Sequence, residues 1–392
     1  MTSDASALHN VLPLDADRAA LSARVWRPEL AGPSVCALRG EHLIDISAQF
    51  ATMRDLCETP DPAAALRAAT GEIIGTVQEI LANSFEARRN PALPHLLAPI
   101  DLQAIKAAGV TFATSMLERV IEEKARGNAA AADGFRAEII RLIGDDLSKL
   151  KPGSEAAMQL KAMLIAQGAW SQYLEVGIGP DAEIFTKAQP MSAVGFGADA
   201  GLHPVSTWNN PEPELVLCVA SSGAIVGATL GNDVNLRDVE GRSALLLGKA
   251  KDNNASCALG PFLRFFDEDF TLDVARKAYI HLKVEGEDGF VLEGGSSMDK
   301  ISRDPADLVR QMLGPHHQYA DGAVLFLGTM FAPIADRDAP GKGFTHKNGD
   351  IVSVSTQSLG TLINRMQLST QCAPWTFGVS HLMRNLARRK LL

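Results

Sequence analysis

The second half of the chain alternates short apolar runs with turns rich in glycine, proline and polar residues. After about residue 180, apolar runs of six or seven residues recur at 215–220, 224–230, 278–284, 322–328 and 350–355. Runs of this length that are bounded by turn residues are typical of β-strands. A single helix is expected to interrupt them at about 304–313, with Asp304 as its N-cap and Pro305 at its first position. The pattern predicts a β-rich domain rather than a wound βαβ sheet.

The first half of the chain predicts a smaller mixture of strands and helices. Strand-like runs separated by turn signals occupy 22–47, and an Ala-rich stretch with helical spacing covers 61–90. A second helical stretch is expected at about 133–149. Between these stretches, an amphipathic helix is predicted from Thr111 to about Gly127, with Phe112, Met116, Leu117 and Val120 on its apolar face and Glu118, Glu122 and Glu123 facing water.

The length of the chain favours two domains. A single hydrophobic core rarely grows beyond about 250–300 residues, and this chain has 392. We expect an N-terminal α+β domain over 1–155, a β-rich catalytic domain over 156–370 and a helical tail over 371–392, which together make an α+β protein. The basic residues at the end of the tail suit the negative end of a docked helix, and a contact with nucleic acid or a membrane is the alternative.

Composition restricts the classes of partner that the protein is expected to bind and the compartment in which it is expected to act. The net charge of −9 argues against a general binder of nucleic acid or of anionic membranes. None of the five cysteines forms a CxxC pair, so a disulfide framework or a zinc cluster is not expected and a reducing cytoplasm fits best. We expect no signal peptide and no membrane span, because the first twenty residues carry acids and no apolar run is long enough.

Three carboxylates suggest a metal site. If Pro211-Glu212-Pro213-Glu214 enters a strand, the alternation of side chains puts Glu212 and Glu214 on one face. Asp233 follows the apolar run 224–230, where a strand is expected to meet a loop. Carboxylate oxygens are hard ligands that favour Mg²⁺, or else Mn²⁺ or Ca²⁺, over zinc. Ordinary surface acids near turns are the alternative that spacing alone leaves open.

The order of several motifs resembles the fumarylacetoacetate hydrolase superfamily. The stretch EPELVLCVASSGAIVGATLGNDVNLRDVEG is similar to its metal-binding signature, with Asn235 where the family more often has Ser. Lys251 lies nine residues before Gly260-Pro261, as the family's lysine does, and Lys249 fits that spacing less well. Later matches are Gly328-Thr329, Gly349-Asp350 and Gly360-Thr361-Leu362. The resemblance covers about 180–370 and implies a mixed β roll or sandwich that binds Mg²⁺ through Glu212, Glu214 and Asp233.

Within this superfamily, the details favour one branch. EIFTKAQP (183–190), WNNPEPEL (208–215), ALLLGKAK (244–251) and GGSSMDK (294–300) resemble dehydratases of 2-keto-3-deoxy sugar acids. This resemblance implies dehydration of a 2-keto-3-deoxypentonate to 2,5-dioxopentanoate by a homo-oligomer, a dimer or larger. A C–C bond hydrolase of acylpyruvates or 2,4-diketo-3-deoxy acids is the main alternative. A catalytically inert homologue that binds metal also stays open.

The resemblance and the chemistry of a chelated 2-keto acid suggest roles for further residues. Lys251 is expected to hold the enolate oxygen or, with a lowered pKa, to act as a base, and Glu240 is the candidate acid or base. The candidate substrate-binding residues are Arg237, Thr329, Ser296, Ser297 and Lys187. Each has a structural alternative, such as an ion pair between Arg237 and Asp238 or Glu240, or a turn cap by Thr329.

Two histidine motifs and the glycine-rich segments are set aside. His316-His317 is expected to be structural or exposed, since adjacent histidines cannot easily face one ion. His203 has no clear catalytic motif around it. The glycines of GFGADAG (195–201) lack the strand–helix context of a dinucleotide site.

Overall fold

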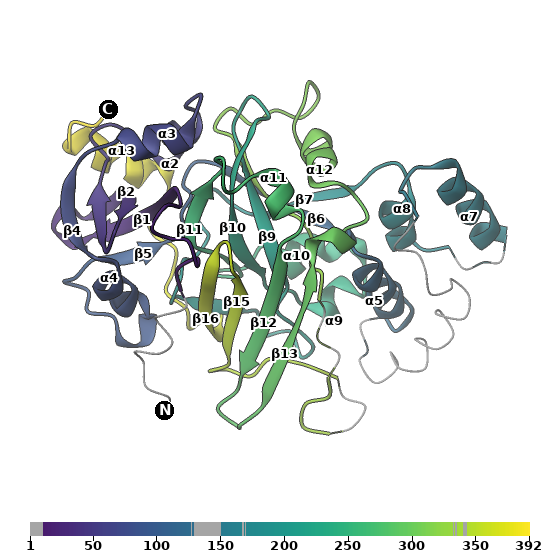
Figure 1. Cartoon of the computed structure of the whole chain (residues 1–392). Coiled ribbons are helices and arrows are strands. Elements are labelled where there is room, and N and C mark those ends of the chain that lie inside the picture. The colour runs from purple at the N-terminus through teal and green to yellow at the C-terminus, as the bar shows by residue number, and fades with distance from the viewer. Residues whose placement is uncertain are drawn as a thin grey trace.

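The computed structural model describes residues 11–392 except 127, 129–149, 167, 169, 332, 334 and 340–342. The helical stretch predicted at 133–149 therefore lies outside the described residues. Two β-sheets form the centre of the molecule, and helices cover its ends (Figure 1). The predicted α+β, β-rich class is confirmed.

The larger sheet has 11 strands and draws on both halves of the chain. Its order is β4 (Glu72–Thr76), β3 (His42–Asp45), β2 (Gly32–Arg39), β1 (Leu21–Arg27), β11 (Cys257–Phe265), β10 (Ile225–Asp233), β9 (Pro213–Val219), β14 (Ala323–Phe326), β6 (Ala104–Gly109) and β7 (Glu183–Ala188), with β5 (His95–Leu97) paired to β1. β1 pairs antiparallel with β11, and β6 pairs parallel with β14. The sheet thus crosses the boundary expected near residue 155, and the division into 1–155, 156–370 and 371–392 stays a prediction.

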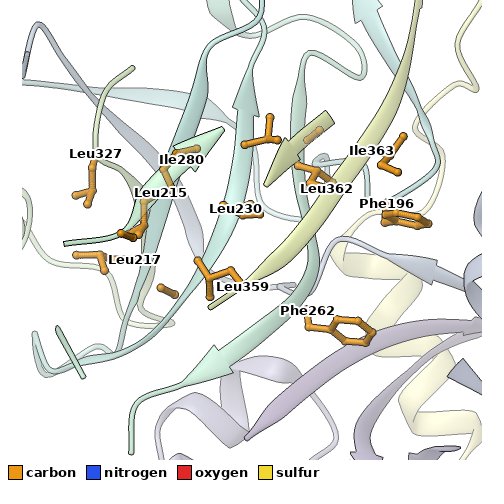
Figure 2. Packing of buried hydrophobic residues seen from close by; sticks show 14 of the residues in the cluster. Phe196, Leu215, Leu217, Leu230, Phe262, Ile280, Leu327, Leu359, Leu362 and Ile363 are labelled. Atoms are coloured by element: carbon orange, nitrogen blue, oxygen red, sulfur yellow. The ribbon is translucent and has the colours of Figure 1, made fainter. Parts of the chain in front are cut away.

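The smaller sheet packs against one face of the larger one. It has five strands in the order β13 (Val291–Ser297), β12 (Tyr279–Glu285), β15 (Ile351–Thr356), β16 (Gly360–Leu368) and β8 (Asp199–Leu202). Figure 2 shows the core between the sheets, where Leu215, Leu217 and Leu230 of the larger sheet lie near Ile280 and Leu362 of the smaller one. All the strands that the apolar runs predicted are present.

The opposite face of the central strands is also covered. Residues of β9 alternate between two core clusters, with Leu215 and Leu217 in the core between the sheets and Val216 and Cys218 in a second cluster. The second cluster includes Met53 and Leu56 of a short helix. Because both faces are buried, β9 is apolar along most of its length instead of alternating with polar residues.

The helices are mostly short, and their capping follows the sequence. Asp304 caps α12 by accepting from the amide of Ala306, and Pro305 is its first residue, as predicted. The described α-helices are α2 (Met53–Cys57), α3 (Pro62–Ala68), α4 (Val77–Ser84), α5 (Ala113–Lys124), α7 (Glu155–Ala166), α8 (Gln172–Ile178), α9 (Arg237–Glu240), α10 (Leu247–Lys251), α11 (Leu272–Ala275), α12 (Pro305–Met312) and α13 (Val379–Arg388). Short 3₁₀ turns are η1 (Pro28–Leu30), η2 (Glu86–Arg88), η4 (Ala244–Leu246) and η5 (Met298–Lys300).

Helix α5 differs from its prediction in one respect that affects the site. Phe112, Met116 and Val120 are buried as expected. Glu122, which was expected to face water, is only 1% exposed and pairs with Arg119 and Arg237. The amphipathic pattern placed this glutamate on the polar face correctly, but that face lies against buried arginines instead of solvent.

The C-terminal tail forms the docked helix that was expected. Leu382 and Leu386 of α13 are buried, and the Asn385 amide donates to the carbonyls of Leu30 and Ala31. Figure 1 shows α13 beside β2, next to the N-terminal strands. Among the described residues, no helix is both long and apolar enough to span a membrane.

Candidate metal centre

The three predicted carboxylates meet at the paired ends of β9 and β10. The register of this antiparallel pair sets Gly231 opposite Glu214, and the amide of Asp233 donates to the carbonyl of Glu212 at 3.0 Å. Opposite residues in a sheet point to the same face. One carboxylate oxygen from each of Glu212, Glu214 and Asp233 lies within 4.8 Å of the others, and all three residues are buried.

Buried cations lie directly behind and beside these carboxylates. Lys251, the last residue of α10, has its Nζ 2.5 Å from Glu212 Oε2 and 3.2 Å from Asp233 Oδ2. Lys187 of β7 has its Nζ 2.8 Å from Asp233 Oδ1. Arg119 of α5 contacts Glu212 Oε1 through Nη2. Each carboxylate oxygen that these cations hold is thereby fixed in direction.

Glu214 is held by the backbone. Its Oε2 accepts from the amide of Gly328 at 2.7 Å. Gly328 has a φ of +91°, and a Cβ at this position would collide with Oγ1 of Thr111. Glycine is therefore required where the chain after β14 approaches the carboxylate.

The electrostatics of the site shift the pKa values of two of its carboxyl groups in opposite directions. Burial, together with the charges of Asp233 and Glu212, raises the pKa of Glu214 well above its ordinary value. Burial alone would also raise the pKa of Asp233, but Lys187 and Lys251 outweigh burial and hold that pKa below its ordinary value. This environment disfavours the charged form of Glu214 unless a cation joins the three carboxylates.

Lys251 is a cation in this environment. Burial alone would lower its pKa, but the neighbouring Asp233 and Glu212 outweigh burial and raise it above the ordinary value. In the metal-free protein the pKa of Lys251 is thus raised, and its action as a base beside a bound metal stays a prediction. Two carboxylates within hydrogen-bonding distance stabilise its ammonium form.

The charges of the site suit a divalent cation. Five buried carboxyl groups, from Glu122, Glu212, Glu214, Asp233 and Glu240, lie among four buried basic side chains, from Arg119, Lys187, Arg237 and Lys251. Glu183, which is half-buried, adds a further carboxylate. A buried excess of negative charge is costly unless it is neutralised. Three convergent carboxylates are the donor set that Mg²⁺ prefers, so the residues present fit this metal.

A small cavity of about 20 Å³ opens over the carboxylates. Glu240 of α9 lines it, with Oε2 3.2 Å from Arg119 Nη1, and so does Thr329, whose hydroxyl donates to the carbonyl of Phe331 at 3.0 Å. The full lining is Ala108, Gly109, Val110, Arg119, Glu183, Phe185, Glu212, Glu214, Asp233, Glu240, Lys251 and Thr329. The structure thus brings six of the predicted site residues to one cavity.

Two cavity residues were missed by the sequence reasoning. Arg119 was hidden in the polar face of α5, and its contact with Glu212 spans 93 residues of the chain. Glu183 lies on β7, where alternation places it on the same face as Phe185 and Lys187. The alternation within EIFTKAQP could therefore have predicted that Glu183 lies on the same face as Lys187.

Glu183 has an unusual acidity for a carboxyl group. Burial and the charge of Glu240 raise its pKa to about 7, against the opposing effect of Arg119 and Lys251. A carboxyl group with a pKa near neutrality can both accept and donate a proton at physiological pH. Glu183 is therefore the candidate proton-transfer group that the geometry adds to Glu240.

Four predicted substrate-binding residues do not line this cavity. The Nζ of Lys187 pairs with Asp233 and donates to the carbonyls of Lys251 at 2.6 Å and of Val234 at 3.2 Å, so Lys187 supports a carboxylate of the site from outside the cavity. Arg237 pairs with Glu122 at 2.8 Å and lies over the Trp208 ring, so its structural alternative involves Glu122 instead of Asp238. Ser296 and Ser297 belong to β13, in the smaller sheet.

The histidines that were not predicted as site residues lie outside the metal cavity. His316 and His317 are exposed, and the Nδ1 of His203 accepts from the amide of Val205. None of the three lines the metal cavity.

Comparison with known proteins finds a family match over part of the chain. Residues 218–367 match the family described as fumarylacetoacetate (FAA) hydrolase, C-terminal. The match contains Asp233, Glu240, Lys251 and Thr329, and it begins just after the Glu212–Glu214 pair.

Two curated relatives are dehydratases of sugar acids. The chain is 33% identical over 184 residues to 2-dehydro-3-deoxy-D-arabinonate dehydratase from Saccharolobus solfataricus, covering 46% of this chain and 57% of that protein. It is 30% identical over 192 residues to a probable 2-keto-3-deoxyxylonate dehydratase from Haloferax volcanii, covering 49% and 62%. The chain thus matches about three fifths of the length of these relatives.

Two solved structures share the fold over nearly the whole chain. A 2-keto-3-deoxy-D-arabinonate dehydratase complexed with magnesium and 2,5-dioxopentanoate aligns with a TM-score of 0.62 and 23% identity, over 89% of this chain and 99% of that one. A 5-carboxymethyl-2-hydroxymuconate delta-isomerase from Mycobacterium smegmatis aligns with a TM-score of 0.52 and 18% identity, over 88% and 98%. At these identities the structures establish the fold, and one fold carries more than one reaction.

Proposed function

We propose that the protein is a metal-dependent dehydratase that converts a 2-keto-3-deoxypentonate into 2,5-dioxopentanoate. The observation that carries this proposal is the buried Glu212–Glu214–Asp233 triad beneath a cavity that also holds Glu183 and Lys251. The names of the two curated relatives support the substrate class. The fumarylacetoacetate hydrolase family match supports the same kind of active site.

Glu212, Glu214 and Asp233 would hold Mg²⁺, and the same oxygen donors would accept Mn²⁺ or Ca²⁺. A bound divalent ion would supply Lewis-acid chemistry to the keto group of a 2-keto acid, which makes the C3 protons more acidic. Lys187 fixes the direction of Asp233, and Gly328 fixes that of Glu214. These supporting contacts set the carboxylates before any ligand arrives.

Glu183 is assigned the proton transfers. As a carboxylate it takes a proton from C3 of the substrate, and as an acid it gives a proton to the C4 hydroxyl as the C4–O bond breaks and water leaves. A pKa of about 7 makes both forms available near neutral pH. Tautomerisation of the resulting enone then yields 2,5-dioxopentanoate. Glu240, whose carboxylate pairs with Arg119, orients that guanidinium.

Lys251 and Thr329 are assigned to the substrate. Lys251 remains an ammonium group because Asp233 and Glu212 raise its pKa, so it places a positive charge at the cavity wall. That charge stabilises an enolate oxygen as negative charge develops there. Thr329 lines the same cavity, and in this assignment its hydroxyl leaves the carbonyl of Phe331 and donates to the substrate carboxylate.

We propose a homo-oligomer of at least two copies and a reducing, cytoplasmic location. The five cysteines are free thiols and buried, which is consistent with a reducing compartment.

The test is product analysis with purified protein supplied with Mg²⁺. The substrates are both C4 epimers of 2-keto-3-deoxypentonate and, separately, an acylpyruvate, with Glu214→Gln as the metal-site control. We expect 2,5-dioxopentanoate from one epimer and none from the variant. Release of pyruvate from the acylpyruvate instead would make the protein a C–C hydrolase. Metal binding measured separately, by calorimetry, distinguishes a wrong substrate from a wrong metal site.

A further inference from the structure

A second cavity lies away from the metal centre. It has a volume of about 210 Å³ and shares no lining residue with the metal cavity. Its walls come from β1, β5, the chain at 191–195 and the segment 373–377 that precedes α13. Figure 1 shows the parts of the chain that carry it, with β1 and β5 beside the C-terminal segment at the left of the view.

Arg24 is a buried cation without an ion pair in this wall. The residue is 5% exposed. Its Nη1 donates to the carbonyl of Ile100 at 3.0 Å, Nη2 contacts the sulfur of Met191 at 3.4 Å, and Nε has no partner among the described residues. The neighbouring acid, Asp101, accepts instead from the amides of Met53 at 2.6 Å and Arg54 at 3.1 Å.

Arg89 is a second cation of this kind. It is half-buried, its Nη2 donates to the carbonyl of Ser84 at 2.7 Å, and its Nε has no partner among the described residues. The two acids near it are engaged elsewhere. Asp199 forms two bonds with Arg365, at 2.8 and 2.7 Å, and Glu86 accepts from the amide of Asp199 at 2.9 Å.

Apart from the carboxylate of Glu86, the remaining walls are aromatic or uncharged. The rings of Trp26 and Phe377 meet edge to face with their centroids 5.2 Å apart, and Trp375 lines the same cavity. His95 lies 6.5 Å from Trp26 and is neutral, because burial and the charge of Arg89 lower its pKa to about 3. The cavity therefore combines two unpaired guanidinium groups with flat apolar surfaces.

We propose that this cavity binds a small organic carboxylate with a planar, apolar body. Burying a guanidinium group without a counter-ion is unfavourable, and an anion beside Arg24 and Arg89 offsets that cost. The aromatic rings offer a planar molecule stacking and apolar burial that inorganic phosphate cannot use. The proposal is independent of the reaction at the metal centre.

Tryptophan fluorescence provides the test, since two of the four tryptophans, Trp26 and Trp375, line the cavity. Benzoate is titrated into the metal-free, full-length protein, with benzamide as its neutral analogue. The variant is Arg89→Gln, and Arg88→Gln is the matched control, because Arg88 is adjacent in sequence, exposed and outside the cavity. We expect saturable binding of benzoate to wild type and to the control, and binding at least tenfold weaker for Arg89→Gln and for benzamide.

Other results overturn the proposal. Failure of wild type to bind benzoate, equal binding of benzamide, or unchanged affinity in Arg89→Gln would each do so. A fluorescence change that follows protein concentration, confirmed by sedimentation, would assign the cavity to a contact between two copies. The benzamide comparison needs only wild-type protein, so the test holds even if Arg89→Gln does not fold. Repeating the titration in Glu214→Gln separates its outcome from that of the dehydratase assignment.

Discussion

The guanidinium group of Arg119 contacts the carboxylate of Glu212 and thereby joins helix α5 to the metal centre. The same guanidinium lies 2.6 Å from Glu122 and 3.2 Å from Glu240. One cation thus serves three buried carboxylates that come from separate parts of the chain. In the protein without metal, Arg119 and Lys251 share the charge of Glu212.

Replacing Arg119 should destabilise the protein in a way that Mg²⁺ partly reverses. Arg119→Gln leaves three buried carboxylates without their shared cation, and loss of one partner of a buried ion pair costs about 3–5 kcal/mol. Bound Mg²⁺ neutralises Glu212, so it should raise the thermal unfolding midpoint more in the variant than in wild type. The measurement is thermal unfolding with and without Mg²⁺.

The control for this prediction is Arg242→Gln, which removes an exposed arginine. It should unfold like wild type under both conditions. If Arg119→Gln is as stable as this control, or gains no more from Mg²⁺ than wild type does, the role assigned to Arg119 is wrong.

Replacing Glu214 should separate metal binding from folding. In Glu214→Gln the affinity for Mg²⁺ should fall by more than roughly 100-fold. Loss of a residue that only hydrogen-bonds to a metal ligand already lowers metal affinity by about 10–100-fold. The metal-free variant should be at least as stable as wild type, because glutamine removes the repulsion from Asp233 and Glu212 that raises the pKa of Glu214. Calorimetric titration and thermal unfolding measure the two effects, with exposed Glu268→Gln as the control. Retained Mg²⁺ affinity would exclude Glu214 as a ligand.

Lys187 should act on the metal through Asp233. Lys187→Met removes the ammonium group 2.8 Å from Asp233 Oδ1. The pKa of Asp233, which Lys187 and Lys251 hold low, should then rise, and the affinity for Mg²⁺ should fall by about 10–100-fold. Lys249→Met is the matched control, because Lys249 is exposed and two residues from Lys251. Equal Mg²⁺ affinities in the two variants would contradict a positioning role for Lys187.

Glu183 should give the metal-free protein a distinct dependence of stability on pH. Its pKa rises from 4.5 in the unfolded chain to about 7 in the folded protein. Between these values the folded state binds the extra proton, so its stability should fall as pH rises and level off above about pH 7. Glu183→Gln should lack this decline.

The comparison is made by urea unfolding of wild type and Glu183→Gln at several pH values. The difference in free energy of unfolding between them should change between about pH 4.5 and 7 and stay constant outside that window. A difference that does not vary with pH would show that Glu183 titrates at its ordinary value. If one side of the pH–rate profile of the active enzyme disappears in Glu183→Gln, this would further link Glu183 to proton transfer.

Local patterns in the sequence predicted the strands, and together with the family resemblance they predicted the candidate metal ligands. Glu212 and Glu214 are two residues apart, so strand alternation alone puts them on one face. Asp233 ends the strand that pairs with theirs, and the pairing brings it opposite Glu212. The cap of α12 by Asp304 is equally local.

Tertiary structure alone decided which other residues reach the cavity. Arg119 meets Glu212 across 93 residues of chain, and no spacing rule records such a contact. The same holds for Glu122, whose polar face turned out to be buried against Arg237, and for Ser296, which the smaller sheet carries away from the site. Periodicity gives the face on which a side chain lies, but the packing of distant elements determines whether that face meets water, a cation or a cavity. The sequence by itself therefore determined the candidate metal ligands, while the fold decided the charges around them.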